Sequence, residues 1–464
     1  MEKEIPSKTV PGKAPELLTR GSPWRCIVLF SLPLLGGEIC LLLYSMADAF
    51  ILGRVLGIGA LAAAGAASSF VQLIFGLALG LSSGFTVITA QRIGAGEENG
   101  IRRSIAAGIS LSLALGLVFT AILVPLARPV LRLMNTPVEI LGDAVVYASI
   151  IIGGIAVSMF NSLFGGIIQA AGDSVTPLVL LTISSILNIL LDLLLVAVIP
   201  WGVRGAAIAT VFSQLVSAAL ALRVLCGRLG NFLPRRGDWR PGRRDLAAHL
   251  SLGLSMALQR IIVEFGNILV QAVINRLGTV TIGAVAAAQK IRALNMMPFF
   301  AVSRGLTTYT AQNYGAGRMD RVNRGIFQTC LLCLGGGLCM ALLNRMGGRF
   351  FASLFIRDSA EGAALAYQYI IFSGYTVTIL GFMLTFRSSL QGLGKHSGPV
   401  MSSVLETLMS VLAAFVLIPR IGFFGVCLVN PLSWLTSFFP VFLDFMAIRK
   451  KKNPEGQPYE TQPP

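Results

Sequence analysis

Two carboxylates in the middle of apolar segments are the residues of this chain best suited to chemistry. Asp48 lies in the first long apolar segment, and Asn188 and Asp192 lie in the fifth, four residues apart and so on one helix face. Thr210 adds a hydroxyl from the sixth. An ionisable group in mid-membrane costs about 2.5–3.5 kcal/mol on insertion scales, so it needs a functional reason. Desolvated carboxylates that lie close together can share a proton or coordinate sodium, and we predict that this set does so.

Other side chains with acidic, basic or phenolic groups also fall within apolar segments, and we predict that they line a substrate cavity. They are Glu38, Tyr44, Arg260, Glu264, Arg387 and Glu406. Glu38 follows Pro33 by five residues, in a region where the proline is expected to bend the helix. The four charged residues of the second half can equally form structural ion pairs, and the sequence leaves both interpretations open.

Membrane-spanning helices must position these residues, because the chain is too apolar for a water-soluble protein of its length. Of its 464 residues, 55% are hydrophobic and 12% are charged. Crossing about 30 Å of hydrocarbon takes roughly 20 helical residues. Twelve apolar segments are long enough, so we predict an all-α membrane protein with twelve transmembrane helices, near 26–52, 60–90, 101–127, 140–168, 175–199, 203–225, 247–275, 281–312, 324–345, 361–390, 398–418 and 423–447.

The second six segments repeat the first six. The residues 91–96, Gln-Arg-Ile-Gly-Ala-Gly, are answered by 312–317, Gln-Asn-Tyr-Gly-Ala-Gly. An even number of spans gives both halves the same orientation, so we predict two pseudo-symmetric six-helix bundles, a parallel repeat around a central cavity. Gly76, Gly80 and Gly84 stand at four-residue spacing, which lets neighbouring helices approach closely. For these glycines and for the paired turns we predict packing roles only.

The repeat also provides an internal control for the polar residues of the first half. Their counterparts in the second half are apolar or neutral: Asp48 corresponds to a position near Ile268 or Leu269, Asn188 to Ser410, Asp192 to Ala414 and Thr210 to Asn430. The scaffold therefore does not need these acids. Their confinement to one half indicates a functional addition.

Basic residues separate to one side of the predicted helices, and the formal net charge is +16. The positive-inside rule then places both termini and the central loop in the cytoplasm. We predict a multi-pass protein of the inner or plasma membrane. Its parts are a tail (1–25), a first lobe (26–226), a linker (227–246), a second lobe (247–447) and a second tail (448–464). Charge dispersed over many loops does not predict a nucleic-acid partner.

No cofactor other than a coupling proton or sodium ion is expected. The seven cysteines fall mostly in apolar runs, and Cys330 and Cys333 lack a second pair of metal ligands nearby. His249 and His396, the two histidines, lie near loops. The chain also lacks the Gly-x-x-x-x-Gly-Lys-Ser/Thr pattern of an ATP site. We therefore do not expect an enzyme.

Several of these features together resemble the MATE family, the multidrug and toxic compound extrusion transporters. They are Pro33, Asp48, the two Gln-x-x-Gly-Ala-Gly turns, the Asn188-x-x-x-Asp192 segment and the Gly-Ala-Ala-Ile-Ala-Thr segment ending at Thr210. The resemblance extends over about 25–449. It implies twelve helices in two bundles, and antiport of organic, often cationic, compounds against protons or sodium. In the DinF-type branch it implies that Asp48, Asn188, Asp192 and Thr210 couple to the cation and that Pro33 bends the first helix. Glu264 meets the pattern of another branch only approximately.

We expect an antiporter that exports amphipathic or cationic organic compounds, works as a monomer and contacts only its substrate and membrane lipid. The alternative is a lipid-linked saccharide flippase of the same superfamily, whose cavity should be rich in Arg and Lys. Arg260, Arg304 and Arg387 keep that alternative open. A major facilitator transporter would show a Gly-x-x-x-Asp-Arg-x-Gly-Arg-Arg-like loop after its second span, which this chain lacks. A membrane-embedded transferase or hydrolase would need a nucleophile with a base, or a metal cluster.

Overall fold

The computed structural model describes residues 18–356 and 359–451, and within these ranges the chain forms helices and no strand. The remaining parts of the two predicted tails, 1–17 and 452–464, lie outside the described residues. The α-helices are α1 (Pro23–Ile51), α2 (Ile58–Ala95), α3 (Glu98–Leu133), α4 (Val138–Gly153), α5 (Ile155–Ala170), α6 (Val175–Asp192), α7 (Val203–Arg228), α8 (Arg243–Ile274), α9 (Thr279–Gly315), α10 (Met319–Phe355), α11 (Ala360–Gly392), α12 (Ser397–Ile421) and α13 (Phe423–Lys451). Two π-helical turns, η1 (Leu52–Leu56) and η2 (Leu193–Val198), continue α1 and α6.

The helices agree with the predicted membrane spans. In the described ranges, ten are long and apolar enough to cross a membrane, and the pair α4 and α5, bent by 44°, counts as one further span. This pair occupies the predicted segment 140–168. The helix α9 has 37 residues and occupies the predicted segment 281–312, which makes twelve spans with the others. Lys290, Arg292 and Arg304 make it less apolar than its neighbours. The all-α fold class is confirmed.

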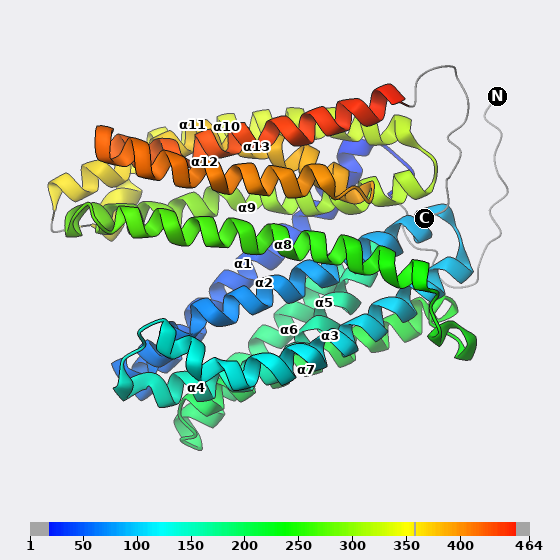
Figure 1. The fold of residues 1–464 in the computed structure, drawn as a ribbon, viewed down its shortest axis with the longest axis horizontal. Helices are drawn as coiled ribbons and strands as arrows, with labels where there is room; N and C mark the ends of the chain where they lie inside the picture. The colour runs from blue at the N-terminus through cyan, green and yellow to red at the C-terminus, as the bar shows by residue number, and fades with distance from the viewer. Residues whose placement is uncertain (1–17, 357–358, 452–464) are drawn as a thin grey trace.

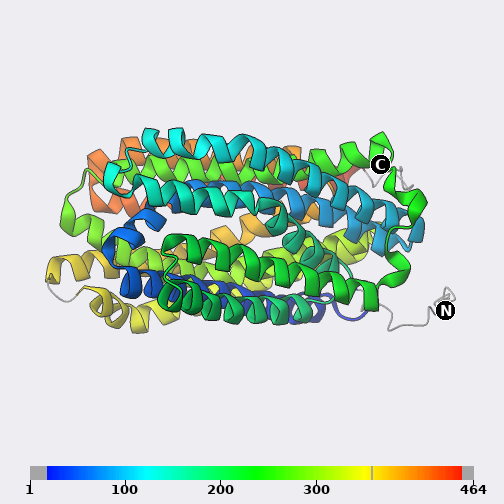
Figure 2. The ribbon, with the colours of Figure 1, turned by 90° about the horizontal axis from the view of Figure 1, so that it is seen from below.

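The spans form two bundles that meet at one end. The first lobe comprises α1–α7 and the second lobe α8–α13. A buried apolar core lies in each lobe, and the core of the first lobe extends to α8 and α9 where the lobes meet. In Figure 1 the bundles converge where the described chain begins and ends, and diverge at the opposite end. Figure 2, turned by 90°, shows the helices of both lobes running along the same long axis. Between the lobes, the linker region holds two short turns, η3 (Gly230–Phe232) and η4 (Arg236–Trp239).

Small residues on α2 let it pack closely against α8 of the other lobe. A Cβ on Gly84 would collide with the backbone of Gly253, and one on Gly80 with the backbone of Ala257. Backbones can come this near only where side chains are absent or very small. The packing role predicted for these two glycines is confirmed. For Gly76, the third glycine of the series, the predicted packing role is wrong. It has open space around it and lines the cavity between the lobes.

The duplicated turns cross from one lobe to the other at the end where the bundles converge, which we call the closed end. Gln91 donates a hydrogen bond of 2.8 Å to the carbonyl of Gly392 in the second lobe. Its repeat partner Gln312 donates one of 2.7 Å to the carbonyl of Ala170 in the first lobe. A Cβ on Gly315 would collide with the carbonyl of Gln91. The turns therefore hold the lobes together, which goes beyond the local packing role predicted for them.

The residues before α1 lie across the closed end. The backbone N–H of Leu18 donates to Gln312 at 2.8 Å, so this segment contacts the same side chain that joins the lobes. The guanidinium of Arg321 donates to the carbonyl of Gly21 at 2.7 Å and to that of Leu18 at 3.1 Å. Arg318 donates to the carbonyl of Thr19 at 3.3 Å. Basic residues of the α9–α10 turn thus fix residues 18–21 by their backbone, and we call this segment the strap.

Candidate functional site

The acids predicted in the first lobe meet at the contact between α1 and α6. The carboxyl groups of Asp48 and Asp192 are close enough to hydrogen-bond to each other, and Asp192 is completely buried. Each acid comes just before a π-helical turn, since η1 begins four residues after Asp48 and η2 directly after Asp192. Such turns widen a helix locally and occur often at functional sites. No pattern in the sequence predicts these two turns.

An amide and two hydroxyls complete this cluster. With its amide nitrogen facing Asp192, Asn188 donates to Asp192 Oδ2 at 2.8 Å and its oxygen accepts from the backbone N–H of Thr210 at 3.1 Å. The hydroxyl of Thr210 lies 3.3 Å from that of Tyr44. We call these five residues, Asp48, Asn188, Asp192, Thr210 and Tyr44, the acid cluster. The structure brings together all four residues predicted for the cation site.

The acid cluster contains buried oxygens that protein donors do not satisfy. Asp48 Oδ1 and Asp192 Oδ1 are shielded from solvent and have no hydrogen-bond partner within the described part of the chain. A buried carboxylate oxygen without a donor is costly, and a shared proton or a bound cation would relieve that cost. The available ligand atoms are oxygens, which suit a hard cation. The described ranges contain no group of three or more His, Cys, Asp or Glu side chains that could hold a metal ion.

Tyr147 of α4 belongs beside this cluster, and the sequence analysis missed it. Its hydroxyl is near enough to interact electrostatically with Asp48, Asp192 and Tyr44. The repeat could have revealed it, because Tyr369 stands at the corresponding position of the second lobe. There Tyr369 accepts a hydrogen bond of 3.2 Å from Asn430, the counterpart of Thr210. The second lobe thus keeps the tyrosine and a polar partner but has no acid at the corresponding positions.

A cavity of about 830 Å³ separates the two lobes. Of the residues predicted to line it, Glu38, Arg260, Glu264 and Arg387 do so. Tyr44 does not, because it belongs to the acid cluster. Glu406 does not either: it is buried behind the wall and accepts a hydrogen bond of 2.7 Å from Arg387. All six residues fall within apolar segments, and that feature alone does not distinguish residues that line the cavity from residues that do not.

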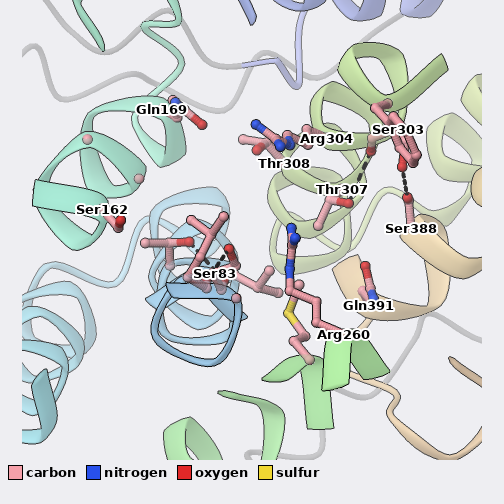
Figure 3. Close-up of a pocket in the computed structure, with 18 of the residues that line it drawn as sticks. Ser83, Ser162, Gln169, Arg260, Ser303, Arg304, Thr307, Thr308, Ser388 and Gln391 are labelled. Carbon is pink, nitrogen blue, oxygen red and sulfur yellow. Dashed lines mark hydrogen bonds between the residues drawn. The ribbon is translucent and has the colours of Figure 1, made fainter. Parts of the chain in front are cut away.

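The wall of the cavity is mainly neutral. Figure 3 shows Ser83, Ser162 and Gln169 on the first-lobe side, facing Ser303, Arg304, Thr307 and Thr308 of α9 and Arg260 of α8 on the other. Apolar side chains, among them Leu41, Leu73 and Phe300, also line the cavity. A cavity of this size with scattered hydroxyls and amides fits a drug-sized amphipathic molecule.

Pro33 lies inside α1, and the helix continues through it to Ile51 as part of one span. Glu38, one turn and a half further on, forms an ion pair of 2.6 Å with Arg304 across to α9. The bend predicted at Pro33 stays a prediction. The proline is nevertheless near the point where α1 contacts both lobes, through α6 and α9.

Comparisons with known proteins agree with one another. The family model described as MatE matches residues 33–194 and 255–416, one segment in each lobe. The probable multidrug resistance protein YpnP of Bacillus subtilis is 26% identical over 84% of this chain and 86% of its own length. The FAD transporter of Shewanella oneidensis is 25% identical over 84% of this chain and 86% of its own length. A solved structure titled as the outward-facing conformation of a multidrug resistance MATE family transporter of the MOP superfamily superposes with a TM-score of 0.87. It is 24% identical and covers 96% of this chain and 100% of its own.

Proposed function

The chain belongs to the MatE family of transporters, and from that premise we propose that it exports amphipathic organic compounds in exchange for a proton or sodium ion bound at the acid cluster. The family match extends over both lobes. Relatives named multidrug resistance proteins support drug export. The observation that carries the coupling proposal is the pair of unsatisfied buried oxygens on Asp48 and Asp192.

The acid cluster is separate from the substrate cavity, so coupling must pass through the first lobe. None of its five residues lines the cavity. Asp48 and Glu38 both lie on α1, however, and Glu38 does line it. A proton or cation at Asp48 and a substrate beside Glu38 would therefore act on the same helix. If each ligand favours a different arrangement of α1 and the lobes, their fluxes are coupled.

The energetics are sufficient without ATP. One elementary charge moving through 100 mV supplies about 2.3 kcal/mol. That free energy supports a substrate gradient of roughly 50-fold before any gradient of the ion itself is added. We place the closed end, with its strap and basic turns, in the cytoplasm of an inner or plasma membrane, so that the cavity of this conformation opens outward.

Transport by purified protein in proteoliposomes tests the coupling. Efflux driven by separately imposed proton and sodium gradients should fall at least about tenfold in Asp48→Asn and in Asp192→Asn. Asp143→Asn is the matched control, because Asp143 is an exposed acid near the start of α4, outside the acid cluster and the cavity lining. Unchanged efflux in both cluster variants would refute the proposed coupling site.

The lipid-linked saccharide flippase remains an alternative with a weaker basis. Its cavity should present several free basic groups for a diphosphate. Arg260, Arg304 and Arg387 do line the wall, but Glu38 pairs with Arg304 at 2.6 Å and Glu406 with Arg387 at 2.7 Å. Two of the three charges are thereby balanced, which favours export of soluble amphipathic compounds.

A further inference from the structure

In the part of the chain that the structure describes, one basic side chain of the cavity has no acid at ion-pair distance. Within the described residues, Arg260 forms no ion pair and no hydrogen bond, whereas Arg304 and Arg387 each contact a glutamate. Glu264, one turn further along α8, does not pair with Arg260 and instead accepts a hydrogen bond of 3.4 Å from Asn267. A guanidinium keeps its charge in proteins, so Arg260 cannot become neutral to relieve this situation.

A second guanidinium stands close to the first. Arg260 and Arg304 come from α8 and α9 and interact electrostatically with each other, and both interact with Glu38. Figure 3 shows both extending from the second lobe into the cavity. Two positive charges against one negative leave this group with an excess of one positive charge. Because like charges repel, an anion between the two guanidinium groups would be favoured.

The surroundings suit a planar anionic group on an apolar molecule. Guanidinium forks match the geometry of carboxylates and phosphates. Hydroxyls of Thr307 and Thr308 stand beside Arg304, and Leu41, Leu73 and Phe300 provide apolar contact. An apolar body and an anionic group can therefore be accommodated together.

We infer that Arg260 and Arg304 form a binding site for the carboxylate or phosphate group of the transported compound. This inference rests on the proposed export function and specifies its substrate class: amphipathic organic anions, including compounds that carry a positive charge elsewhere. Glu38 competes with that group for Arg304. The cargo would be released when a change in the lobes moves α8 and α9 apart or restores the Glu38 contact.

Binding to the purified full-length protein tests this site independently of transport. The probes are carboxyfluorescein, an anion, and rhodamine 6G, a cation on the same type of ring system, both followed by fluorescence anisotropy. Loss of one ion pair in a partly desolvated site corresponds to roughly 10- to 100-fold in affinity. We expect Arg260→Gln to weaken carboxyfluorescein binding by that factor and to leave rhodamine 6G unchanged or bound more tightly. Arg260→Lys should retain part of the affinity.

Two further variants make the test specific. Glu38→Gln frees Arg304 and should strengthen carboxyfluorescein binding, the opposite sign to Arg260→Gln. Arg276→Gln is the matched control, because Arg276 is exposed at the far end of α8 and outside the cavity lining. Equal carboxyfluorescein affinity in wild type and Arg260→Gln would overturn the inference, as would an anion affinity that responds only to Arg276→Gln.

Further experiments distinguish a lipid anion from a soluble one, and they distinguish failure of the anion site from failure of the export function. Dithionite accessibility of NBD-labelled phosphatidic acid in proteoliposomes reports a lipid cargo. Movement of that lipid that depends on Arg260, with no carboxyfluorescein binding, supports an anion-binding site that serves a lipid. Binding of carboxyfluorescein that depends on Arg260, with no efflux of any probe under either ion gradient, supports the site and refutes the export function on which it was placed. Gradient-driven efflux that is insensitive to Arg260→Gln for both probes supports export and refutes the anion site.

Discussion

The ion pair behind the cavity wall allows the structural role of Glu406 to be measured. Its carboxylate lies 2.7 Å from Arg387, and the two side chains are only 11% and 12% exposed. Arg387 also donates to Ser402 at 2.7 Å, so one of its contacts remains when the acid is removed. Breaking a buried pair by deleting one partner typically costs about 3–5 kcal/mol. Because the pair is slightly exposed and Arg387 keeps its contact with Ser402, we expect Glu406→Ala to lower the free energy of unfolding by about 3 kcal/mol, the lower end of this range.

The assay is chemical and thermal unfolding of the purified protein in detergent, with Glu406→Ala, with the single variants Arg387→Met and Glu406→Met, and with the double variant that combines the last two. Glu406→Ala should lower stability strongly, and Arg387→Met with Glu406→Met should recover much of the loss, because both charges are then gone. Arg345→Ala serves as the control, because Arg345 is an exposed arginine. In the described part of the chain it donates one hydrogen bond, of 3.1 Å, to the hydroxyl of Tyr367. Stability unchanged in Glu406→Ala, or a double variant that is worse than both singles, would refute the structural interpretation of this pair.

Three further predictions concern the closed end and the acid cluster. Gly315→Val should separate the lobes at the closed end, because its side chain would meet the carbonyl of Gln91; a single cysteine in the cavity should then react faster with an impermeant thiol reagent from that side. Arg321→Ala removes the hydrogen bonds to the strap, each worth about 1.5–3 kcal/mol when charge-assisted. Hydrogen exchange at 18–21 should accelerate by at least tenfold, while exchange in α12 does not change. Thr210→Val removes the contact with Tyr44 and should shift the cation concentration for half-maximal transport by roughly 2- to 12-fold, measured in proteoliposomes against Asn430→Ala.

Much of the fold could be predicted because the membrane limits the possible structures. Apolar segments of sufficient length must become helices, and the repeated Gln-x-x-Gly-Ala-Gly turns indicated two lobes of equal orientation. The same reasoning did not reveal what the turns do. Gln91 and Gln312 exchange hydrogen bonds with the opposite lobe, and contacts between distant segments leave no local pattern in a sequence.

The acid cluster was accessible from the sequence for a different reason. Comparing the two halves singled out Asp48 and Asp192, because Ala414 and an apolar residue stand at the corresponding positions. Tyr147 was missed because the prediction relied on positions where the two halves differ, whereas a tyrosine kept in both halves, as at Tyr147 and Tyr369, is a signal of another kind. The π-helical turns next to the acids depend on backbone packing against neighbouring helices, which apolar residues such as those of η2 do not specify.

The cavity was the least predictable part. Arg260, Glu264, Arg387 and Glu406 looked equivalent in the sequence, as charged groups in apolar segments. The structure separates them, since Arg387 and Glu406 pair, Glu264 contacts Asn267, and Arg260 alone of the four forms neither a hydrogen bond nor an ion pair with another described residue. Helix rotation decides which of these groups meet. Successive side chains are separated by about 100° around a helix. The rotation of the whole helix about its axis, which decides the direction of each side chain, does not follow from composition and spacing.

Linkage between substrate and cation tests the acid cluster most directly. The dissociation constant of a transported fluorescent compound is measured on purified protein over a range of sodium concentrations and of pH, for wild type, Asp192→Asn and the control Asp143→Asn. Since coupling is reciprocal, a cation that competes across the lobes must change substrate affinity, by about 5- to 150-fold for typical coupling energies. We predict that the substrate affinity of wild type and Asp143→Asn depends on one of the two cations and that the affinity of Asp192→Asn does not. An Asp192→Asn protein with the wild-type cation dependence would contradict the assignment of Asp48 and Asp192 as the coupling site.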